Sequence, residues 1–391
     1  MNLNLSFFKS PAANELAQEI AQKLNSNNQL SLIDSYRKAG FENELVTFAL
    51  NQARYKQRAR VKFGEQAMQM LFTEPGLEQA TRGAVANWHA ERFKACGIGS
   101  VTDLGAGIGS DALGFAQAGL KVSAVESHPE SYLALEHNLS SFPHASAIQA
   151  DATTQQILTE AIWLDPARRE QDRKSLTVQR LEPDMFSPNL DFVFEQARKY
   201  PAGIKLAPGF PHELIPKDFE ANWVSHDQDL VELTLWSPPI GQPGVRKAVM
   251  ISDQVQEFEG TDLTSWIGPL GKFIYEPDVS LIRSHLIGDF AKQNQLNLIS
   301  ENIAYLSADL LLESPWLKAY EVTEVLPLDV KQIKAYCASH DIGVLEIKKR
   351  GVDITPEQLR PKLKLKGAGA ATLILTKVGS ARQAIVCRPI R

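Results

Sequence analysis

Cysteine is scarce in this chain of 391 residues, and long apolar runs are missing. The three cysteines, Cys96, Cys337 and Cys387, lie far apart and form no C-x-x-C pair, which argues against a zinc site or a disulfide framework. No run approaches the roughly 18 apolar residues that a membrane-spanning helix needs, and the N-terminal residues lack the pattern of a secretory signal. The eight histidines show no metal-ligand spacing. We therefore expect a cytoplasmic protein with no membrane segment and no bound metal.

The net charge of −5 is small, but it is distributed unevenly along the chain. Residues 346–391 contain 11 Lys and Arg against 3 Asp and Glu, whereas the remaining 345 residues contain 30 against 43. Such an asymmetry is typical of a basic module attached to an acidic body. Clustered cations are the electrostatic footprint of a protein that binds a phosphate backbone, so nucleic acid becomes a candidate partner.

Basic and apolar residues alternate in the stretch KLKLK within this module. We expect Leu363 and Leu365 to be buried and Lys362, Lys364 and Lys366 to face outward. A cationic face of this kind suits phosphate groups, and the alternative interpretation is an ordinary solvated surface.

The pattern of apolar residues changes twice along the chain. Up to about residue 95, segments such as NELAQEIAQKLN place apolar side chains at helical spacing, which predicts a helical region that covers the next domain or contributes to a substrate pocket. From Gly99, strands and helices alternate, which favours a parallel sheet covered by helices, with VELTLWS and RKAVMIS as an antiparallel edge hairpin. After about Asp253 a smaller α+β pattern follows, ending in a hairpin of ATLILTKVG and QAIVCRPI. We expect domains at 1–95, 96–255 and 256–391.

A glycine-rich loop joins the first predicted strand to the following helix, in the sequence D-L-G-A-G-I-G-S-D from Asp103. Gly105, Gly107 and Gly109 let the backbone turn tightly and approach a ligand closely. A dinucleotide-binding G-x-G-x-x-G loop would require glycine where Ser110 stands, and its pyrophosphate would not favour an acid at the start of the loop. The opening carboxylate instead suits a cationic amino-acid group, which disfavours a nicotinamide-dependent oxidoreductase.

Acidic residues also follow the next three predicted strands. Glu126 closes the second strand, where a carboxylate can accept hydrogen bonds from both hydroxyls of a ribose. Asp151, with Ala152 beside it, closes the third strand and can accept a hydrogen bond from an adenine amino group. Asp165 closes the fourth strand. All of these acids are expected at the carboxyl edge of one sheet, where open α/β folds bind ligands; the alternative is a set of solubilising acids at strand ends.

This order and spacing resembles class I S-adenosylmethionine-dependent methyltransferases over about residues 100–253. The resemblance implies a Rossmann-like sheet and S-adenosylmethionine as the cofactor. It also implies that Asp103 and the glycines at 105, 107 and 109 hold the methionine part, that Glu126 holds the ribose, and that Asp151 holds the adenine.

The end of the fourth strand resembles the Asp/Asn-Pro-Pro-aromatic motif of N-methyltransferases, and reads Asp165-Pro166-Ala167-Arg168-Arg169. Transfer from a sulfonium needs alignment more than acid–base help, so the Asp165 carboxylate and the Pro166 carbonyl would orient an exocyclic amine toward the methyl group. Ala167 replaces the second proline and Arg168 the aromatic residue. We expect Arg168 and Arg169 to bind phosphate or stack on a base; a solvated loop or ion pairs with the nearby acids are the alternatives.

A narrower resemblance rests on the Asp-Pro-Ala-Arg-Arg stretch together with IKLAPG, YEPDVSLIRSHL and RGVDITPEQLRPKLKLKG. These segments are similar to bacterial class I methyltransferases with a C-terminal α+β THUMP-like domain, over about residues 75–391, and distantly to trimethylguanosine-synthase-type enzymes. The resemblance implies an RNA substrate. Together with the Asp-Pro pair and the basic residues 346–391, it leads us to expect an RNA N-methyltransferase that holds the RNA through these basic residues. Carbon-5 methylation of pyrimidines is disfavoured, because no cysteine lies near the fourth strand. A methyltransferase acting on a small molecule or a protein, and a non-catalytic RNA-binding protein with a vestigial cofactor fold, remain open.

Overall fold

The computed structural model describes residues 5–25, 27–168, 185–264 and 266–390. Arg169 and most of the polar stretch after Asp165 lie outside the described residues, as does the side chain of Arg168. The chain divides into two compact units, one formed by residues 1–220 and 234–244 and the other by residues 221–233 and 245–391.

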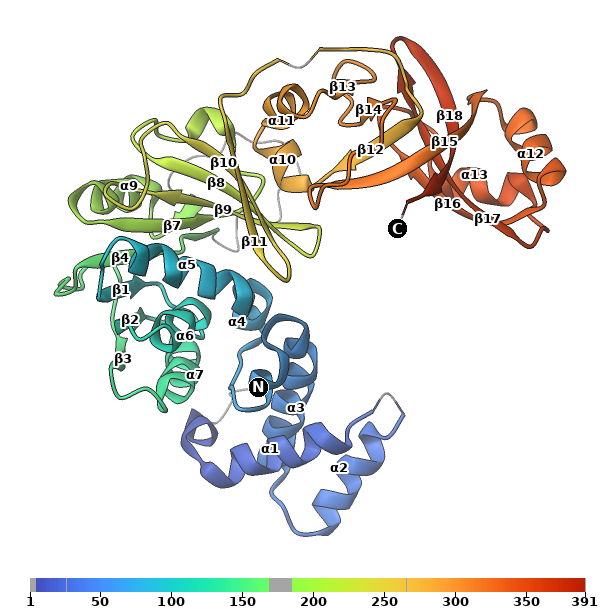
Figure 1. Ribbon diagram of the computed structural model, residues 1–391. Helices are drawn as coiled ribbons and strands as arrows, with labels where there is room; N and C mark the ends of the chain where they lie inside the picture. Colours follow the sequence, from blue (N-terminus) through green and yellow to red (C-terminus); the bar gives the residue numbers. More distant parts are fainter. Residues whose placement is uncertain (1–4, 26, 169–184, 265, 391) are drawn as a thin grey trace. The chain divides into compact units, whose positions relative to one another are not determined.

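The N-terminal region is helical, as predicted (Figure 1). Local signals set the helix ends: the Ser10 and Thr73 hydroxyls accept hydrogen bonds from Ala13 N and Gly76 N, and a proline stands in the first turn of each helix. The elements are η1 (Leu5–Lys9), α1 (Pro11–Lys23), α2 (Gln29–Lys38), α3 (Asn43–Phe63), η2 (Gly64–Met68), α4 (Glu74–Gln79) and α5 (Gly83–Ala95).

A parallel sheet forms the centre of the first unit and confirms the predicted Rossmann-like architecture. Its strands lie in the order β3-β2-β1-β4-β7, and Figure 1 shows α6 and α7 side by side along β1, β2 and β3. The bounds are β1 (Ser100–Leu104), α6 (Ser110–Gln117), β2 (Lys121–Glu126), α7 (Pro129–Leu139), β3 (Ala145–Gln149), β4 (Ala161–Leu164), α9 (Leu190–Lys199), β7 (Ala202–Leu206) and η4 (His212–Leu214), with the short strands β5 (Ala167–Arg168) and β6 (Phe186–Ser187) paired to each other.

The sheet continues with β9 (Asp229–Trp236), β8 (Glu220–His226), β10 (Arg246–Ile251) and β11 (Val255–Gly260), in that spatial order. The predicted hairpin of VELTLWS with RKAVMIS, which are β9 and β10, is therefore wrong. Asp227 and Gln228 both have positive φ, at 50° and 71°, which is the geometry of a tight hairpin turn, and β9 consequently folds back beside β8. β10 therefore lies on the side of β8 that faces away from β9. It pairs in parallel with β8 and antiparallel with β11.

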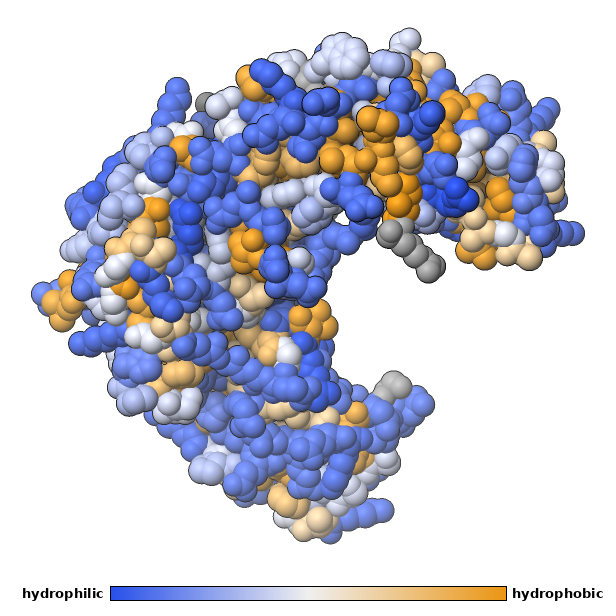
Figure 2. Space-filling model, in the orientation of Figure 1, coloured by the Kyte–Doolittle hydropathy of each residue, from blue (hydrophilic) through white to orange (hydrophobic). Residues whose placement is uncertain are grey.

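The second unit ends in a mostly antiparallel sheet of order β13-β14-β12-β15-β18-β17-β16, in which the predicted β17–β18 hairpin is confirmed. A capping box of Thr355 and Gln358 starts α13. Figure 2 shows apolar side chains gathered on the surface of this sheet, and Leu311, Leu317 and Ile390 are among the residues that line a groove there. The bounds are β12 (Phe273–Pro277), α10 (Val279–Arg283), α11 (Ile287–Gln293), β13 (Asn297–Leu298), β14 (Leu306–Ala308), β15 (Leu317–Pro327), α12 (Val330–Ser339), β16 (Ile342–Lys349), α13 (Pro356–Leu363), β17 (Gly369–Val378) and β18 (Ala381–Pro389).

Among the described residues, no helix has both the length and the apolar character needed to cross a membrane. Nor do the His, Cys, Asp and Glu side chains of the described ranges form a group of three that could hold a metal ion.

Candidate active site

A cleft of about 320 Å³ lies in the first unit, where the parallel strands end. Most of the residues singled out from the sequence meet there, since the lining includes Gly105, Gly107, Glu126, Asp151, Ala152 and Asp165. The lining also includes residues that the sequence did not point to, from α4, from the start of α7 and from β6: Pro75, Gly76, Gln79, Ala80, Ser131, Ser187 and Pro188. Asp103, Gly109 and Pro166 are not part of the lining, although Gly109 and Pro166 each stand between two lining residues in the chain and Asp103 precedes Gly105 by two positions.

The glycine loop has the backbone geometry that its sequence predicts. Gly105, Gly107 and Gly109 have φ values of +93°, +57° and +88°, a region that other residues rarely adopt. Gly109 has a second reason to be glycine, because a Cβ there would lie 2.6 Å from Leu135 Cδ1. This position therefore lets α6 pack against α7, whereas Gly105 and Gly107 bring the backbone to the cleft.

The carboxylate of Glu126 is held in place by the glycine loop. Its Oε2 accepts a hydrogen bond from Gly107 N at 2.9 Å, and its Oε1 accepts one from His128 N at 2.6 Å. Asp151 is oriented by Thr153, whose backbone N and Oγ1 donate to Asp151 Oδ1 at 2.8 and 2.7 Å. These hydrogen bonds hold the pKa of Asp151 below its usual value, so an ionised carboxylate faces the cleft.

Asp103 is a buried acid without a hydrogen bond to its Oδ1 among the described residues. Its side chain belongs to β1 and is 1 % exposed. Burial, together with the carboxylates of Asp111 and Asp165, raises the pKa of Asp103 well above its usual value. A buried acceptor of this kind costs stability unless a donor reaches it, and a cationic donor would satisfy both the missing hydrogen bond and the charge.

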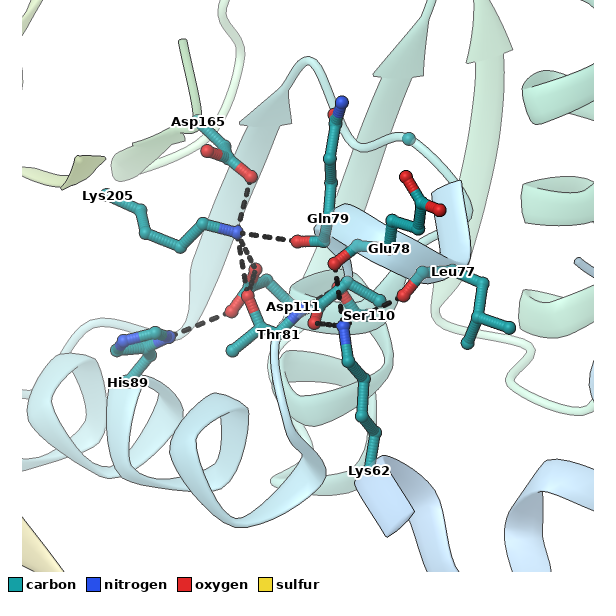
Figure 3. A network of polar contacts seen from close by, with 12 residues as sticks. Lys62, Leu77, Glu78, Gln79, Thr81, His89, Ser110, Asp111, Asp165 and Lys205 are labelled. Carbon is teal, nitrogen blue, oxygen red and sulfur yellow. Dashed lines mark hydrogen bonds and ion pairs between the residues drawn. The ribbon is translucent and has the colours of Figure 1, made fainter. Parts of the chain in front are cut away.

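A polar network joins Asp165 to residues of other elements (Figure 3). Lys205, just inside the end of β7, brings its Nζ to 2.5 Å from Asp165 Oδ2 and 3.9 Å from Asp111 Oδ2, and it donates to Thr81 Oγ1 at 2.9 Å. On the opposite side of the network, His89 Nδ1 lies 2.8 Å from Asp111 Oδ1. Lys205 thus pairs with the acid that closes β4, which holds the Asp165 carboxylate in one position.

Asp111 and His89 are partners that sequence reasoning missed. Burial acts to raise the pKa of Asp111, but the hydrogen bond from His89 and the Lys205 cation outweigh it, and the pKa of Asp111 is lowered. The His89 ring is fully buried and packs on Trp163, with 4.3 Å between ring centroids. Since 22 residues separate the partners along the chain, no local pattern could have joined them.

Comparison with known proteins gives a consistent result. Residues 317–389 match the family described as THUMP domain-like. The chain is 29% identical over 351 residues to an uncharacterized S-adenosylmethionine-dependent methyltransferase found in two strains of Mycobacterium tuberculosis, CDC 1551 / Oshkosh and H37Rv, covering 86% of this chain and 95% of the relative. It also resembles the crystal structure of a provisionally assigned methyltransferase from Porphyromonas gingivalis W83, with a TM-score of 0.76, 17% identity and coverage of 97% and 98% of the two chains. At 17% identity, the likeness to this structure shows a shared fold and no more.

The fold and these likenesses together define an S-adenosylmethionine-dependent methyltransferase. More particularly, the protein is a methyltransferase of this class that carries a C-terminal THUMP-like domain. The site fits the cofactor: a buried carboxyl that lacks a donor suits an ammonium group, and a carboxylate fixed by two backbone amides suits a ribose. Asp151, whose side chain is exposed, lines the same cleft as Glu126.

Proposed function

We propose that this methyltransferase acts on a nitrogen of a base in RNA. The match of residues 317–389 to the THUMP-like family carries the RNA part of the proposal, because THUMP domains are associated with RNA modification. The Asp165-Pro166 pair supports the nitrogen part, since it resembles the motif of N-methyltransferases.

The cofactor would lie across the edge of the sheet. In this arrangement Asp103 receives the ammonium group, Gly105 and Gly107 pass close to the methionine part, Glu126 receives the ribose hydroxyls, and Asp151 with Ala152 receives the adenine. The sulfonium supplies an activated methyl group, so the protein's task is to align the target.

Asp165 would position the target amine together with the carbonyl of Pro166. Lys205 holds Asp165 Oδ2 and thereby fixes the direction of this carboxylate, which lines the cleft (Figure 3). The contribution of Arg168 and Arg169 remains a prediction. Among the described residues that line the cleft there is no aromatic side chain, so a stacked base must find its platform outside this lining.

The second unit offers a cationic face for the RNA. Leu363 is buried and Leu365 is half-buried, while Lys362, Lys364 and Lys366 are exposed, as the alternating pattern predicts. Within the described part of the chain these three lysines form no ion pair. Their charges are therefore available for phosphate groups.

Labelling with a radioactive methyl donor tests the proposal directly. The protein is incubated with labelled S-adenosylmethionine and total RNA from cells that lack the gene, and the labelled nucleoside is identified after digestion. We expect label on a base nitrogen, in RNA from the deficient cells but not in RNA from normal cells. Label only in small molecules or protein would contradict the RNA assignment, and label on carbon would contradict the role of Asp165.

A charge series tests the cationic face. Replacing Lys362, Lys364 and Lys366 by Ala should lower the slope of log K against log salt for RNA binding by about 2 to 3, since each lost phosphate contact removes about 0.7 to 0.9. The matched control replaces Lys38, Lys94 and Lys121, exposed lysines of the first unit, by Ala. Both variants carry the same net charge, so an equal loss in both would mean that the effect is non-specific.

A further inference from the structure

The N-terminal helical region supplies part of the cleft through the short helix α4 and the residues after it. Pro75, Gly76, Gln79 and Ala80 all line the cleft beside the glycine loop. We infer that residues 74–81 form a wall of the S-adenosylmethionine site, and that Lys62 is a positioning residue that holds this wall in place. The inference rests on the proposed cofactor role of the cleft and is independent of the RNA substrate.

Lys62 holds the end of α4 without lining the cleft itself. It extends from α3, and its Nζ donates hydrogen bonds to the carbonyl oxygens of Leu77, Glu78 and Ala80 at 2.8, 2.9 and 2.8 Å (Figure 3). A helix leaves its last carbonyl groups without partners inside the helix, and a cation there is favoured by the helix dipole as well. One ammonium group therefore fixes the turn from which Gln79 and Ala80 reach the cleft.

Lys205 holds the same segment from the other side. Its Nζ lies 3.5 Å from Gln79 O and donates to Thr81 Oγ1 at 2.9 Å, in addition to its ion pair with Asp165. In Figure 3 the Gln79 side chain points away from both lysines, while its carbonyl faces Lys205. The wall is thus tied through Lys205 to Asp165, the acid that we assign to the target amine.

Further bonds join residues 71–81 to the glycine loop. Thr81 N donates to Ser110 Oγ at 3.1 Å, and Thr81 Oγ1 donates to Asp111 Oδ2 at 2.7 Å. The buried amide of Asn138 donates from its Nδ2 to Leu71 O at 3.0 Å and to Ile108 O at 2.8 Å. The loop and the wall are therefore positioned by the same set of hydrogen bonds, and a shift of one is expected to move the other.

Gly76 sets how closely α4 approaches the loop. A Cβ at this position would collide with Cγ2 of Ile108, which stands between Gly107 and Gly109, and would lie 2.6 Å from Thr73 Oγ1. The φ of Gly76 is not in the left-handed region, so alanine suits the helix there as well as glycine or better. A loss of binding in Gly76→Ala would therefore come from displacement of the wall rather than from backbone strain.

Calorimetric titration with S-adenosylmethionine tests the inference on the full chain. We expect Lys62→Met and Gly76→Ala each to raise the Kd by about tenfold. Part of the binding free energy must then order the wall that Lys62 no longer holds, or move back the wall that the new Cβ at position 76 displaces. The matched control for Lys62 is Arg58→Met, also on α3. It removes exposed ion pairs to Glu74 and Glu78, which lie on α4. The control for Gly76 is Gly83→Ala, where the new Cβ would meet Lys62 O at an ordinary 3.6 Å. Both controls should bind like the wild type.

Hydrogen exchange of the wild-type protein gives a readout that needs no variant. Saturating S-adenosylhomocysteine should slow exchange of the amides of residues 74–81, and leave those of α2 unchanged. Unchanged exchange in residues 74–81, or folded Lys62→Met and Gly76→Ala proteins that bind like their controls, would overturn the inference while leaving the cofactor cleft intact. Failure of the wild type to bind S-adenosylmethionine at all would overturn the cofactor assignment and the wall together.

Discussion

Replacing Asp103 by Asn should stabilise the cofactor-free protein and weaken cofactor binding at the same time. The folded protein raises the pKa of this carboxyl by burial and by the Asp111 and Asp165 charges. The folded state therefore binds the proton more tightly than the unfolded state does. At every pH above the unfolded pKa, the free energy of unfolding is then lower than it would be with a side chain that does not ionise. We therefore expect a higher melting temperature for Asp103→Asn at pH 7, with the difference vanishing below about pH 4.

Cofactor binding should respond in the opposite direction. The bond between a carboxylate and an ammonium group contributes about 1.5 to 3 kcal/mol, so Asp103→Asn should raise the Kd for S-adenosylmethionine about 10- to 150-fold. In the wild type, protonation of Asp103 competes with the cationic group. The Kd should therefore rise about tenfold for each pH unit below the pKa of Asp103, and this dependence should be absent in the variant.

Calorimetry between pH 5 and pH 8, in buffers of different ionisation enthalpy, measures both the Kd and the protons released on binding. Asp111→Asn is the matched control, because Asp111 is also buried but has His89 and Thr81 as partners. That variant should lose about 1 to 3 kcal/mol of stability instead of gaining any. A wild-type Kd that does not change with pH, combined with unaltered affinity in Asp103→Asn, would refute the assignment of this carboxyl to the ammonium group.

Three further substitutions probe the packing and charge of the two units. Lys205→Met removes the cation from a cluster of carboxylates and should cost about 1 to 3 kcal/mol in urea unfolding at pH 8 but less at pH 4, where the carboxylates begin to be protonated. Gly114→Ala brings a Cβ to 2.8 Å from Ala86 O and should lower the urea midpoint by overpacking, at about 1 to 3 kcal/mol, with an unchanged slope. Glu276→Gln removes the nearer carboxylate partner of Lys348, at 2.7 Å against 3.5 Å for Glu346, and should lower the melting temperature at pH 7. Ion pairing outweighs burial and lowers the pKa of Glu276, so the wild type should lose this advantage as the pH falls below about 4.

The sequence predicted the elements that depend on neighbours along the chain. The alternation of strands and helices, the glycine loop and the acids at the strand ends all follow from local spacing, and the acids at 126, 151 and 165 do meet in one cleft. The β9–β10 hairpin was the exception. The residues PPIGQPGV that join these two strands are rich in Pro and Gly and favour a turn. The two-residue turn at Asp227 and Gln228 nevertheless decides which strands are neighbours.

The partners of the site residues could not be predicted in the same way. Lys62 bonds to carbonyl groups 15 to 18 residues away, and Lys205 reaches Thr81 across 124 residues. Backbone carbonyl groups carry no sequence signal, so a lysine that binds them looks like any solvated lysine until the fold is known. The contribution of α4 to the cleft was open for the same reason.

The charge count of residues 346–391 also overstates the number of cations that are available to bind RNA. Lys348 and Arg350 form ion pairs with Glu276, and Arg388 pairs with Glu321, both of which lie outside the module. The exposed cations that form no ion pair within the described residues are Lys349, Arg360, Lys362, Lys364 and Lys366. Five phosphate contacts limit the salt slope of this cluster to about 3.5 on a single strand and about 4.5 on a duplex. A steeper slope would require contacts outside the cluster, of which the arginines after Asp165 are the nearest to the proposed transfer site along the chain.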